Sequence, residues 1–344
     1  MGNLRAIELG NEPECRCSFN SLQNSVLTLA DYASAGQAIV ANSGGSWTPA
    51  IDAESQDNWD ILVGEAISTK NIIQAGNSNS APPTWGAAEL IATENATAKS
   101  YVYDYAHHNY PGGTVTSLMS HSGIVSNMAQ FDADITAAEG TGKAYVLGET
   151  NSVSGGGAAT VSPLFGAALW TMDYVVYATT KNIKRSYFHH GTIGLCYYCW
   201  WGRYDMEAPY YGAYAATAAL ADGAYISALD PGTTNYAAYV IYDSSKKPLR
   251  ALLYNSDFYA SGTRPSVSYI LSGLTATSVQ AKRLTAANAN SRVDEGSNPT
   301  FGGQTFANVT CAIQGTATFE TTSVVSGAAS FTVYASEALL IYLQ

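Results

Sequence analysis

Basic residues are scarce in this sequence. Its 344 residues include 16 Lys and Arg against 27 Asp and Glu, which gives a net charge of −11 at pH 7. The basic residues are scattered and form no patch along the chain. Nucleic acids and anionic membrane surfaces are bound through clustered positive charge, so we expect neither as a partner.

Long apolar runs are also missing, and no stretch of about 18 apolar residues that could form a transmembrane helix occurs. Residues 1–5 lead directly into a predicted strand and leave no room for the apolar segment of a secretory leader. We therefore expect no signal peptide in this chain. Glycosylation sequons at Asn95 and Asn308, with abundant Ser, Thr, Gly and Tyr, favour an extracellular parent protein.

Cysteine is sparse and its number is odd. The five cysteines form a C-x-C pair, a C-x-x-C pair and a single residue: Cys15, Cys17, Cys196, Cys199 and Cys311. The two pairs lie far apart in a large core and lack the local composition of a zinc knuckle, so we expect no metal. Disulfides between loops fit an oxidising compartment better. At least one thiol is then left free or paired with sequence absent here.

The pattern of residue types along the chain changes near residue 222. Up to that point short apolar segments alternate with amphipathic ones, which is typical of β/α units in a parallel sheet. We predict strands at 5–9, 71–75, 102–106, 144–148 and 184–189. Helices are predicted at 25–41, 85–100, 121–139, 163–180 and 210–221. From about 224 onward, alternating β-branched and aromatic residues between Gly, Ser and Pro turns predict an antiparallel β-sandwich. The predicted domains are therefore 1–222 and 223–344.

Two glutamates follow predicted strands of the first domain. Glu12 ends the segment AIELGNE and is followed by Pro13, which cannot continue a strand. Glu149 stands in AYVLGETNS, just after a similar apolar run. Side chains at strand ends are where (β/α)8 enzymes keep their chemistry, and a retaining glycosidase needs two carboxyl groups about 5 Å apart. Alone, each could be an ordinary turn or surface glutamate, and spacing does not prove that the two meet.

Three segments resemble one family. LGNEP at 9–13, HHNY at 107–110 and GETNSVSGGG at 148–157 look like the marked segments of the heparanase and β-glucuronidase family, glycoside hydrolase family 79. The resemblance implies that Glu12 is the acid/base after barrel strand 4 and Glu149 the nucleophile after strand 7. It also implies that Asn11 contacts the sugar 2-hydroxyl and that Tyr110 hydrogen-bonds the nucleophile.

Substrate recognition is predicted in two loops. Successive glycines let a backbone approach a ligand and can aim several N–H groups at an anion. In the family, the segment matching Gly155, Gly156 and Gly157 binds the carboxylate of glucuronic acid, whereas a flexible loop is the alternative. Ser154 departs from the aromatic hydroxyl that often precedes these glycines, which leaves the acid recognised open. Tyr198 and Trp200 are further candidates for sugar contact, although such aromatic residues are more often part of a core.

The resemblance also predicts which part of a barrel is present. If the strand at 5–9 is barrel strand 4, the chain is a C-terminal portion that holds strands 4 to 8 of an incomplete (β/α)8 TIM barrel. We then expect an open sheet with Glu12 beside an edge strand, and poor solubility and activity unless an upstream segment of roughly 150 residues is restored.

The function predicted from the sequence is removal of β-linked glucuronic acid, or its 4-O-methyl form, from a glycan by double displacement, without a cofactor. One alternative is another retaining β-glycosidase of the same clan, such as a glucosidase or xylanase. The other is an inactive, truncated carbohydrate-binding remnant. His107 and His108 lie near a strand end, but without a carboxylate cluster they indicate packing or hydrogen bonding and no metal. The aglycone and the choice between endo and exo cleavage stay open.

Overall fold

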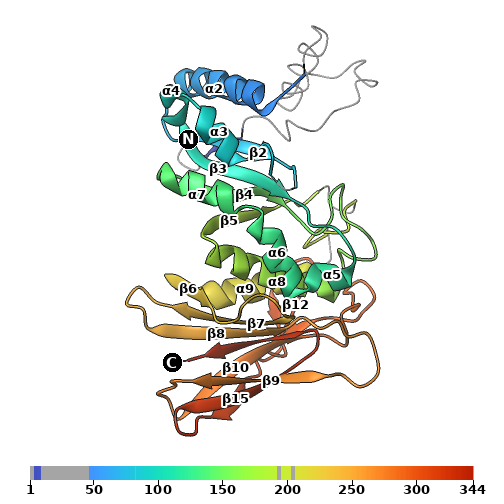
Figure 1. Ribbon diagram of the computed structural model, residues 1–344. Coiled ribbons are helices and arrows are strands. Elements are labelled where there is room, and N and C mark those ends of the chain that lie inside the picture. The colour runs from blue at the N-terminus through green and yellow to red at the C-terminus, as the bar shows by residue number, and fades with distance from the viewer. Residues whose placement is uncertain (1–3, 9–45, 82, 192–194, 203–205, 344) are drawn as a thin grey trace. The chain divides into compact units, whose positions relative to one another are not determined.

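The computed structural model describes residues 4–8, 46–81, 83–191, 195–202 and 206–343 (Figure 1). Contacts divide the chain into two compact units. The first comprises residues 1–109, 128–150 and 181–189, and the second comprises 110–127, 151–180 and 190–344. The domain boundary at residue 222 is a different division, and it stays a prediction.

The first unit contains a parallel sheet of five strands in the order β1-β2-β3-β4-β5 (Figure 1). Its strands are β1 (Ile7–Glu8), β2 (Ile73–Ser78), β3 (Val102–Asn109), β4 (Ala144–Thr150) and β5 (Ile183–Phe188). Every neighbouring pair is parallel. The prediction of a parallel sheet within a mixed α/β and β protein is confirmed. Strands β3 and β4 run further than predicted because their ladder continues to the pair Asn109 and Thr150.

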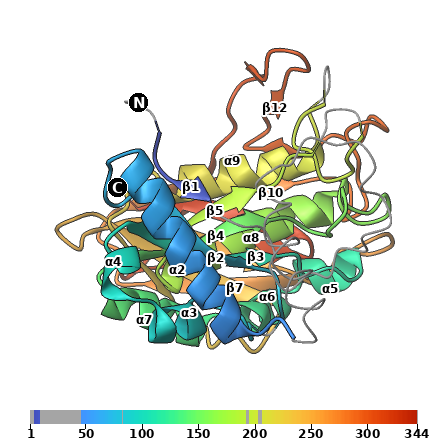
Figure 2. The same ribbon diagram turned by 90° about the horizontal axis from the view of Figure 1, so that it is seen from above.

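The helices of the first unit differ more from the prediction. They are α2 (Pro49–Ala66), α3 (Ala87–Thr93), α4 (Ala96–Lys99) and α7 (Asp132–Gly140), and α3 packs between α2 and α7 (Figure 2). The predicted helix 85–100 is two helices, because the Asn95 side chain accepts hydrogen bonds from the amides of Thr97 and Ala98 and starts a new one. The predicted helix 25–41 lies outside the described residues.

Helix α2 was not predicted, although its N-terminus carries clear signals. The Thr48 hydroxyl accepts a hydrogen bond from the Ile51 amide, and Pro49 occupies the first turn, where its missing N–H costs nothing. The periodicity is obscured because α2 buries two carboxyl groups, Asp57 and Asp60. A helix whose buried face is partly acidic has no simple apolar stripe.

The buried acids of α2 face Glu94, the residue that ends α3. The Gln56 amide donates to Asp60 Oδ1 at 2.6 Å, and Tyr105 donates to Glu94 Oε2 at 2.6 Å. Among the described residues, Asp60 Oδ2 and Glu94 Oε1 have no hydrogen-bond partner. Burial, with the nearby acids Glu94 and Asp57, raises the pKa of Asp60 to about 8 against the hydrogen bond from Gln56. Burial likewise raises the pKa of Glu94 to about 6.

This cluster predicts that stability falls as the pH rises. The folded state keeps a proton on Asp60 that the unfolded chain releases near its ordinary pKa of 3.8, so the stabilisation is complete below that pH. This stabilisation is lost as the pH rises through about 8. Each unit by which the pKa in the folded state exceeds that in the unfolded state corresponds to about 1.4 kcal/mol of free energy of unfolding. Asp60→Asn cannot ionise and should flatten the decline in thermal unfolding midpoint between these pH values. Glu54→Gln, an exposed change on the same helix, should not. An unchanged decline in Asp60→Asn would contradict the assignment.

The second unit joins helices to antiparallel sheets. Its helices are α5 (Val115–Met119), most of α6 (His121–Ala129), α8 (Phe165–Thr180) and α9 (Ala208–Leu220). Helix α8 is buried on nearly all sides, as its almost wholly apolar sequence requires. Helices α8 and α9 approach closely at Gly212, where an added Cβ would lie 1.8 Å from the Ala168 carbonyl oxygen.

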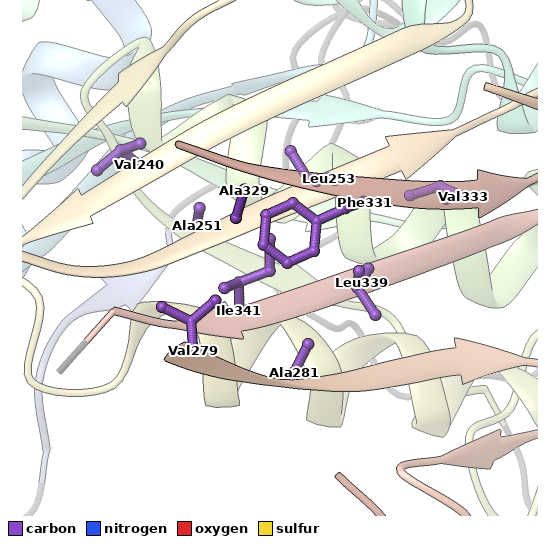
Figure 3. Close-up of a cluster of buried hydrophobic side chains, with 10 residues drawn as sticks. All are labelled: Val240, Ala251, Leu253, Val279, Ala281, Ala329, Phe331, Val333, Leu339 and Ile341. Carbon is purple, nitrogen blue, oxygen red and sulfur yellow. The ribbon is translucent and has the colours of Figure 1, made fainter. Parts of the chain in front are cut away.

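The antiparallel part follows the predicted alternation of inward and outward residues. One sheet has the order β11-β10-β16-β8-β7-β6 with β14 beside β10, and two smaller sheets pair β15 with β9 and β12 with β13. Their bounds are β6 (Tyr225–Ala228), β7 (Tyr236–Tyr242), β8 (Pro248–Asn255), β9 (Ser266–Ser272), β10 (Ser278–Thr285), β11 (Thr300–Phe301), β12 (Thr305–Phe306), β13 (Ile313–Gln314), β14 (Glu320–Ser323), β15 (Ala328–Tyr334) and β16 (Glu337–Tyr342). Phe331 of β15 packs among Leu253, Leu339 and Ile341 of the large sheet, so the core lies between two sheet layers (Figure 3).

A buried histidine fastens the helices of the second unit to its large sheet. His121 Nδ1 lies 2.8 Å from Asp173 of α8, and its Nε2 lies 3.0 Å from Asp230. Tyr239 of β7 donates to the other oxygen of Asp173 at 2.6 Å. Burial alone would lower the pKa of His121, but the charges and hydrogen bonds of the two aspartates outweigh it and raise the pKa to about 10. His121 is therefore a buried cation held by two anions.

Across the described part of the chain, no helix has the length and apolar character needed to cross a membrane.

Candidate active site

Glu149 is the last residue but one of β4, at the carboxyl end of the parallel sheet. Its register partner on β3 is His108, and the ladder shifts by one residue just before this pair. Glu149 is half-buried. The sequence predicts Glu149 just after the strand. In the structure Glu149 is still part of β4 and is paired with β3. A carboxylate here is held by strand backbone on both sides, so its position is fixed by the sheet.

His108 links this position to the first strand. Its Nε2 lies 3.4 Å from Glu8 Oε1 of β1, and the Gln74 side chain donates to Glu8 Oε2 at 3.2 Å. These residues come from β1, β2 and β3 and share the face that carries Glu149 in the register. The face is therefore polar across four strands.

Asp104 is the most deeply buried acid of that face. It lies on β3, and among the described residues neither of its carboxylate oxygens accepts a hydrogen bond. Burial raises its pKa to about 6, although the positive charges of Arg5 and Arg185 act in the opposite direction. Glu8 adds a smaller upward contribution to the pKa. This face of the sheet therefore carries three acids, Glu8, Asp104 and Glu149, with Asp104 near the beginning of β3 and Glu149 near the end of β4.

His107 points to the opposite face of β3 and serves packing. Its Nε2 is 2.9 Å from the Ser80 carbonyl oxygen, and its ring centroid is 5.3 Å from that of Phe131. Phe131 in turn packs 6.3 Å from the ring of Tyr145 on β4. The sequence-based interpretation of His107 as a packing and hydrogen-bonding residue agrees with these contacts.

The glycine loop, residues 155–157, lies in the second unit and has an unusual backbone. Gly155, Gly156 and Gly157 have φ values of 68°, 95° and 88°, a region that residues with a Cβ rarely adopt. Within the described part of the chain, none of the three amides donates a hydrogen bond. Ser162 Oγ closes the loop by accepting from the Ala158 amide at 3.0 Å. Successive backbone N–H groups in a turn can form an anion-binding nest, so this loop is a candidate for one.

The three glycines are not equivalent, which gives a matched pair of variants. An added Cβ at Gly157 would lie 2.7 Å from Ser162 Oγ and 2.9 Å from the Tyr198 amide nitrogen, whereas one at Gly155 would meet nothing within 4 Å. Each alanine variant carries a backbone cost of about 1–2 kcal/mol. Gly157→Ala must also displace Tyr198, so its loss in free energy of unfolding, measured by denaturant titration, should clearly exceed that of Gly155→Ala. Equal losses would show that Tyr198 gives way easily.

Tyr198 and Trp200 occupy different settings. Tyr198 is only 2% exposed, so its side chain is buried. Trp200 is half-buried, and its neighbour Trp201 stacks on His190 with ring centroids 4.4 Å apart. The prediction that Tyr198 and Trp200 contact a sugar stays a prediction.

The cysteines beside these aromatic residues, Cys196 and Cys199, form a disulfide with each other, a pairing that the sequence left open. Cys311 is a free, exposed thiol. The ligand atoms of His190, Cys196 and Cys199 lie within 4.8 Å of one another, the arrangement of three soft-metal ligands. Because the disulfide uses both sulfurs, the trio cannot supply the thiolates that a metal would need.

The other predicted site residues are only partly placed. Tyr110 follows the last residue of β3 directly and opens a loop in which the Gly112 amide donates to the Ser152 carbonyl oxygen at 2.9 Å. Ser154 is exposed and directly precedes the glycine loop. Glu12 and Asn11 lie outside the described residues, as do Cys15 and Cys17.

The polar face of the sheet was missed by the sequence reasoning. It comprises side chains from four strands of the sheet, Glu8, Gln74, Asp104 and Arg185. Their signal was available, because polar residues on one face of several predicted parallel strands indicate a polar interior at that face. The predicted strand limits ended too early to align these residues with Glu149.

Comparison with known proteins identifies a family model in the C-terminal part of the chain. Residues 238–340 match the glycosyl hydrolase family 79 C-terminal beta domain. A β-glucuronidase of Aspergillus niger is 30% identical over 251 residues, which cover 63% of this chain and 45% of that protein. A β-glucuronidase of Neurospora crassa is 30% identical over 163 residues, or 42% of this chain and 28% of that protein. The matches therefore span less than half the length of these relatives.

A solved structure is similar over the whole chain. It is a 4-O-α-L-rhamnosyl-β-D-glucuronidase from Fusarium oxysporum 12S, in complex with Rha-GlcA. The two chains are 46% identical with a TM-score of 0.89, and the match covers 100% of this chain and 71% of that one.

Proposed function

This chain belongs to glycoside hydrolase family 79, and we propose that it carries the nucleophile and the substrate-recognition loop of a retaining β-glucuronidase. Two observations carry the proposal: a strand-end carboxylate, Glu149, in the first unit, and a run of three glycines in the second unit whose amides donate no hydrogen bond within the described part of the chain. Family membership supports the reaction type. We assign β1 to β5 to strands 4 to 8 of a (β/α)8 barrel, followed by a β-sandwich.

The proposed reaction proceeds in two displacements. Glu149, ionised, attacks the anomeric carbon and forms a glycosyl ester while Glu12 gives its proton to the departing glycosidic oxygen. Glu12 then takes a proton from water, which attacks the same carbon, releases the sugar with retained configuration and restores the Glu149 carboxylate. Asn11 is assigned to the sugar 2-hydroxyl and Tyr110 to orientation of the nucleophile.

The substrate carboxylate is assigned to the glycine loop. An anion gains several amide donors there without a cationic side chain, and left-handed backbone brings consecutive N–H groups onto one side. Ser154 can add a hydroxyl donor at the entrance of the loop, with Tyr198 and Trp200 proposed as the aromatic contacts of the sugar. The partner is a glucuronic-acid-containing glycan, and we propose an extracellular setting.

The experiment compares aryl β-D-glucuronide with aryl β-D-glucoside, using the intact protein. Loss of the carboxylate leaves the loop amides unpaired, so kcat/KM should favour the glucuronide by about 10²-fold or more. The first product observed by NMR should be the β-anomer, since the mechanism retains configuration. Equal turnover of the glucoside would favour a neutral β-glycosidase. Sugar binding without turnover would favour a carbohydrate-binding remnant.

A glucuronide capped at O4 is a second candidate substrate, favoured by the 46% identity to an enzyme that acts on 4-O-rhamnosyl glucuronide. An aryl 4-O-α-L-rhamnosyl-β-D-glucuronide, assayed beside the uncapped compound, separates the two. Faster release from the capped substrate would identify a pocket that holds two sugars. Faster release from the uncapped substrate would restrict the pocket to the terminal glucuronic acid.

A further inference from the structure

A short disulfide-closed turn packs against the glycine loop. Cys196 and Cys199 are three residues apart, with Cα atoms separated by 5.6 Å. Within this turn the Tyr197 amide donates to the Gly156 carbonyl oxygen at 2.7 Å. The next amide nitrogen, that of Tyr198, lies so close to Gly157 that a Cβ there would approach it to 2.9 Å. The turn therefore contacts two successive residues of the loop through its backbone.

The turn is itself held at both ends. Tyr198 and Cys199 are 2% and 3% exposed, so both side chains are buried. At the other end Cys196 packs on Gly191, where an added Cβ would come within 2.9 Å of the Cys196 Cβ. By contrast, the Tyr197 side chain is 51% exposed, so Tyr197 acts on the loop through its backbone.

We propose that the Cys196–Cys199 disulfide is a specificity-determining brace for the glycine loop. By closing the turn it keeps the Tyr197 amide on the Gly156 carbonyl, and this contact orients the amides of residues 155–157 toward an anion. Three successive glycines have wide backbone freedom and cannot hold such an orientation alone. A crosslink removes conformations that the open turn would sample, so the donor set is preorganised before substrate arrives. The inference rests on the proposed assignment of the loop to the substrate carboxylate.

The brace predicts a loss confined to charged substrate. In Cys196→Ser/Cys199→Ser the KM for aryl glucuronide should rise about tenfold, which is the loss of one well-oriented charged contact. The kcat should change little, and the kcat/KM for aryl glucoside should stay the same. Cys311→Ser, which removes the exposed free thiol, is the matched control and should match the parent on both substrates. Unchanged KM for the glucuronide, or equal losses on both substrates, would overturn the proposal.

A second pair of variants keeps the test sharp if the double variant folds poorly. Tyr197→Pro removes the amide that donates to Gly156 and leaves both cysteines in place, whereas Tyr197→Ala keeps the amide. We expect the KM for glucuronide to rise in Tyr197→Pro and to stay unchanged in Tyr197→Ala. Identical behaviour of the two variants would exclude the backbone hydrogen bond as the link.

An activity-independent measurement separates the brace from the proposed function. Hydrogen exchange of the Tyr197 amide, which its hydrogen bond to the Gly156 carbonyl oxygen protects, should be faster in Cys196→Ser/Cys199→Ser than in the parent when followed by NMR. If the parent hydrolyses no glucuronide, the proposed function fails, and faster exchange still supports the brace. If exchange is the same in both proteins, the brace fails even where glucuronidase activity is present.

Discussion

Glu149→Gln is expected to lower the kcat for aryl glucuronide by several orders of magnitude while leaving the fold nearly intact. The amide cannot form the glycosyl ester, so the covalent route is closed. The change is isosteric, and the side chain is half-buried at the end of β4, where it contributes little packing. Steady-state kinetics of the intact protein measure the first effect, and the thermal unfolding midpoint measures the second.

The control for this variant is Glu139→Gln, which changes an exposed glutamate of α7 in the same unit. It should keep both kcat and the unfolding midpoint. If Glu149→Gln kept more than a few per cent of the parent kcat, Glu149 would not be the nucleophile. A large drop in the midpoint would instead show that its carboxylate is mainly structural.

Strand positions were predictable because the apolar strands alternate with polar loops along the chain. The segment AYVLGE predicts β4 well, since a parallel strand buried on both faces reads as a continuous apolar run. Its end was less predictable, because Glu149 and Thr150 are polar and yet stay in the ladder with β3. Polar residues at functional strand ends pair through their backbone, and sequence pattern reports only side chains.

Helix α2 and the acid cluster were missed for a related reason. Asp57 and Asp60 occupy the buried face of α2, so the sequence shows charge where a core position should be apolar. Gln56, which donates a hydrogen bond to Asp60, lies on the same helix. Asn95, whose amide donates to Asp57, is 38 residues away in the sequence. No periodicity can reveal a partner at that separation, because the contact exists only after the helices have packed.

The candidate site was predictable residue by residue but not in its surroundings. Glu149 and the glycine run stand out in the sequence because a glutamate after an apolar strand, followed closely by three glycines, is an unusual pattern. The polar face behind Glu149, with Glu8 near His108, required the strand register. The contact between Tyr197 and Gly156 joins residues 41 positions apart and likewise needed the fold.

Glu12→Ala is expected to show a loss that depends on the leaving group. Without a proton donor, substrates with basic leaving groups should lose about 10²–10⁴-fold in rate, whereas a dinitrophenyl glucuronide, whose leaving group departs unprotonated, should still form the glycosyl ester. Breakdown of that ester then becomes slow, because no base activates water.

Azide distinguishes this role from a structural one. It attacks the anomeric carbon without giving up a proton, so it should speed turnover of the dinitrophenyl substrate by Glu12→Ala and produce β-glucuronosyl azide. The parent protein should respond little, and Glu149→Gln should not respond by this route, because it forms no ester for azide to attack. Chromatography of the products checks the result. If Glu12→Ala gave no glycosyl azide while remaining folded, Glu12 would not be the acid/base, and the proton donor would have to come from another carboxyl group near Glu149, with Glu8 on the same sheet face as the first to test.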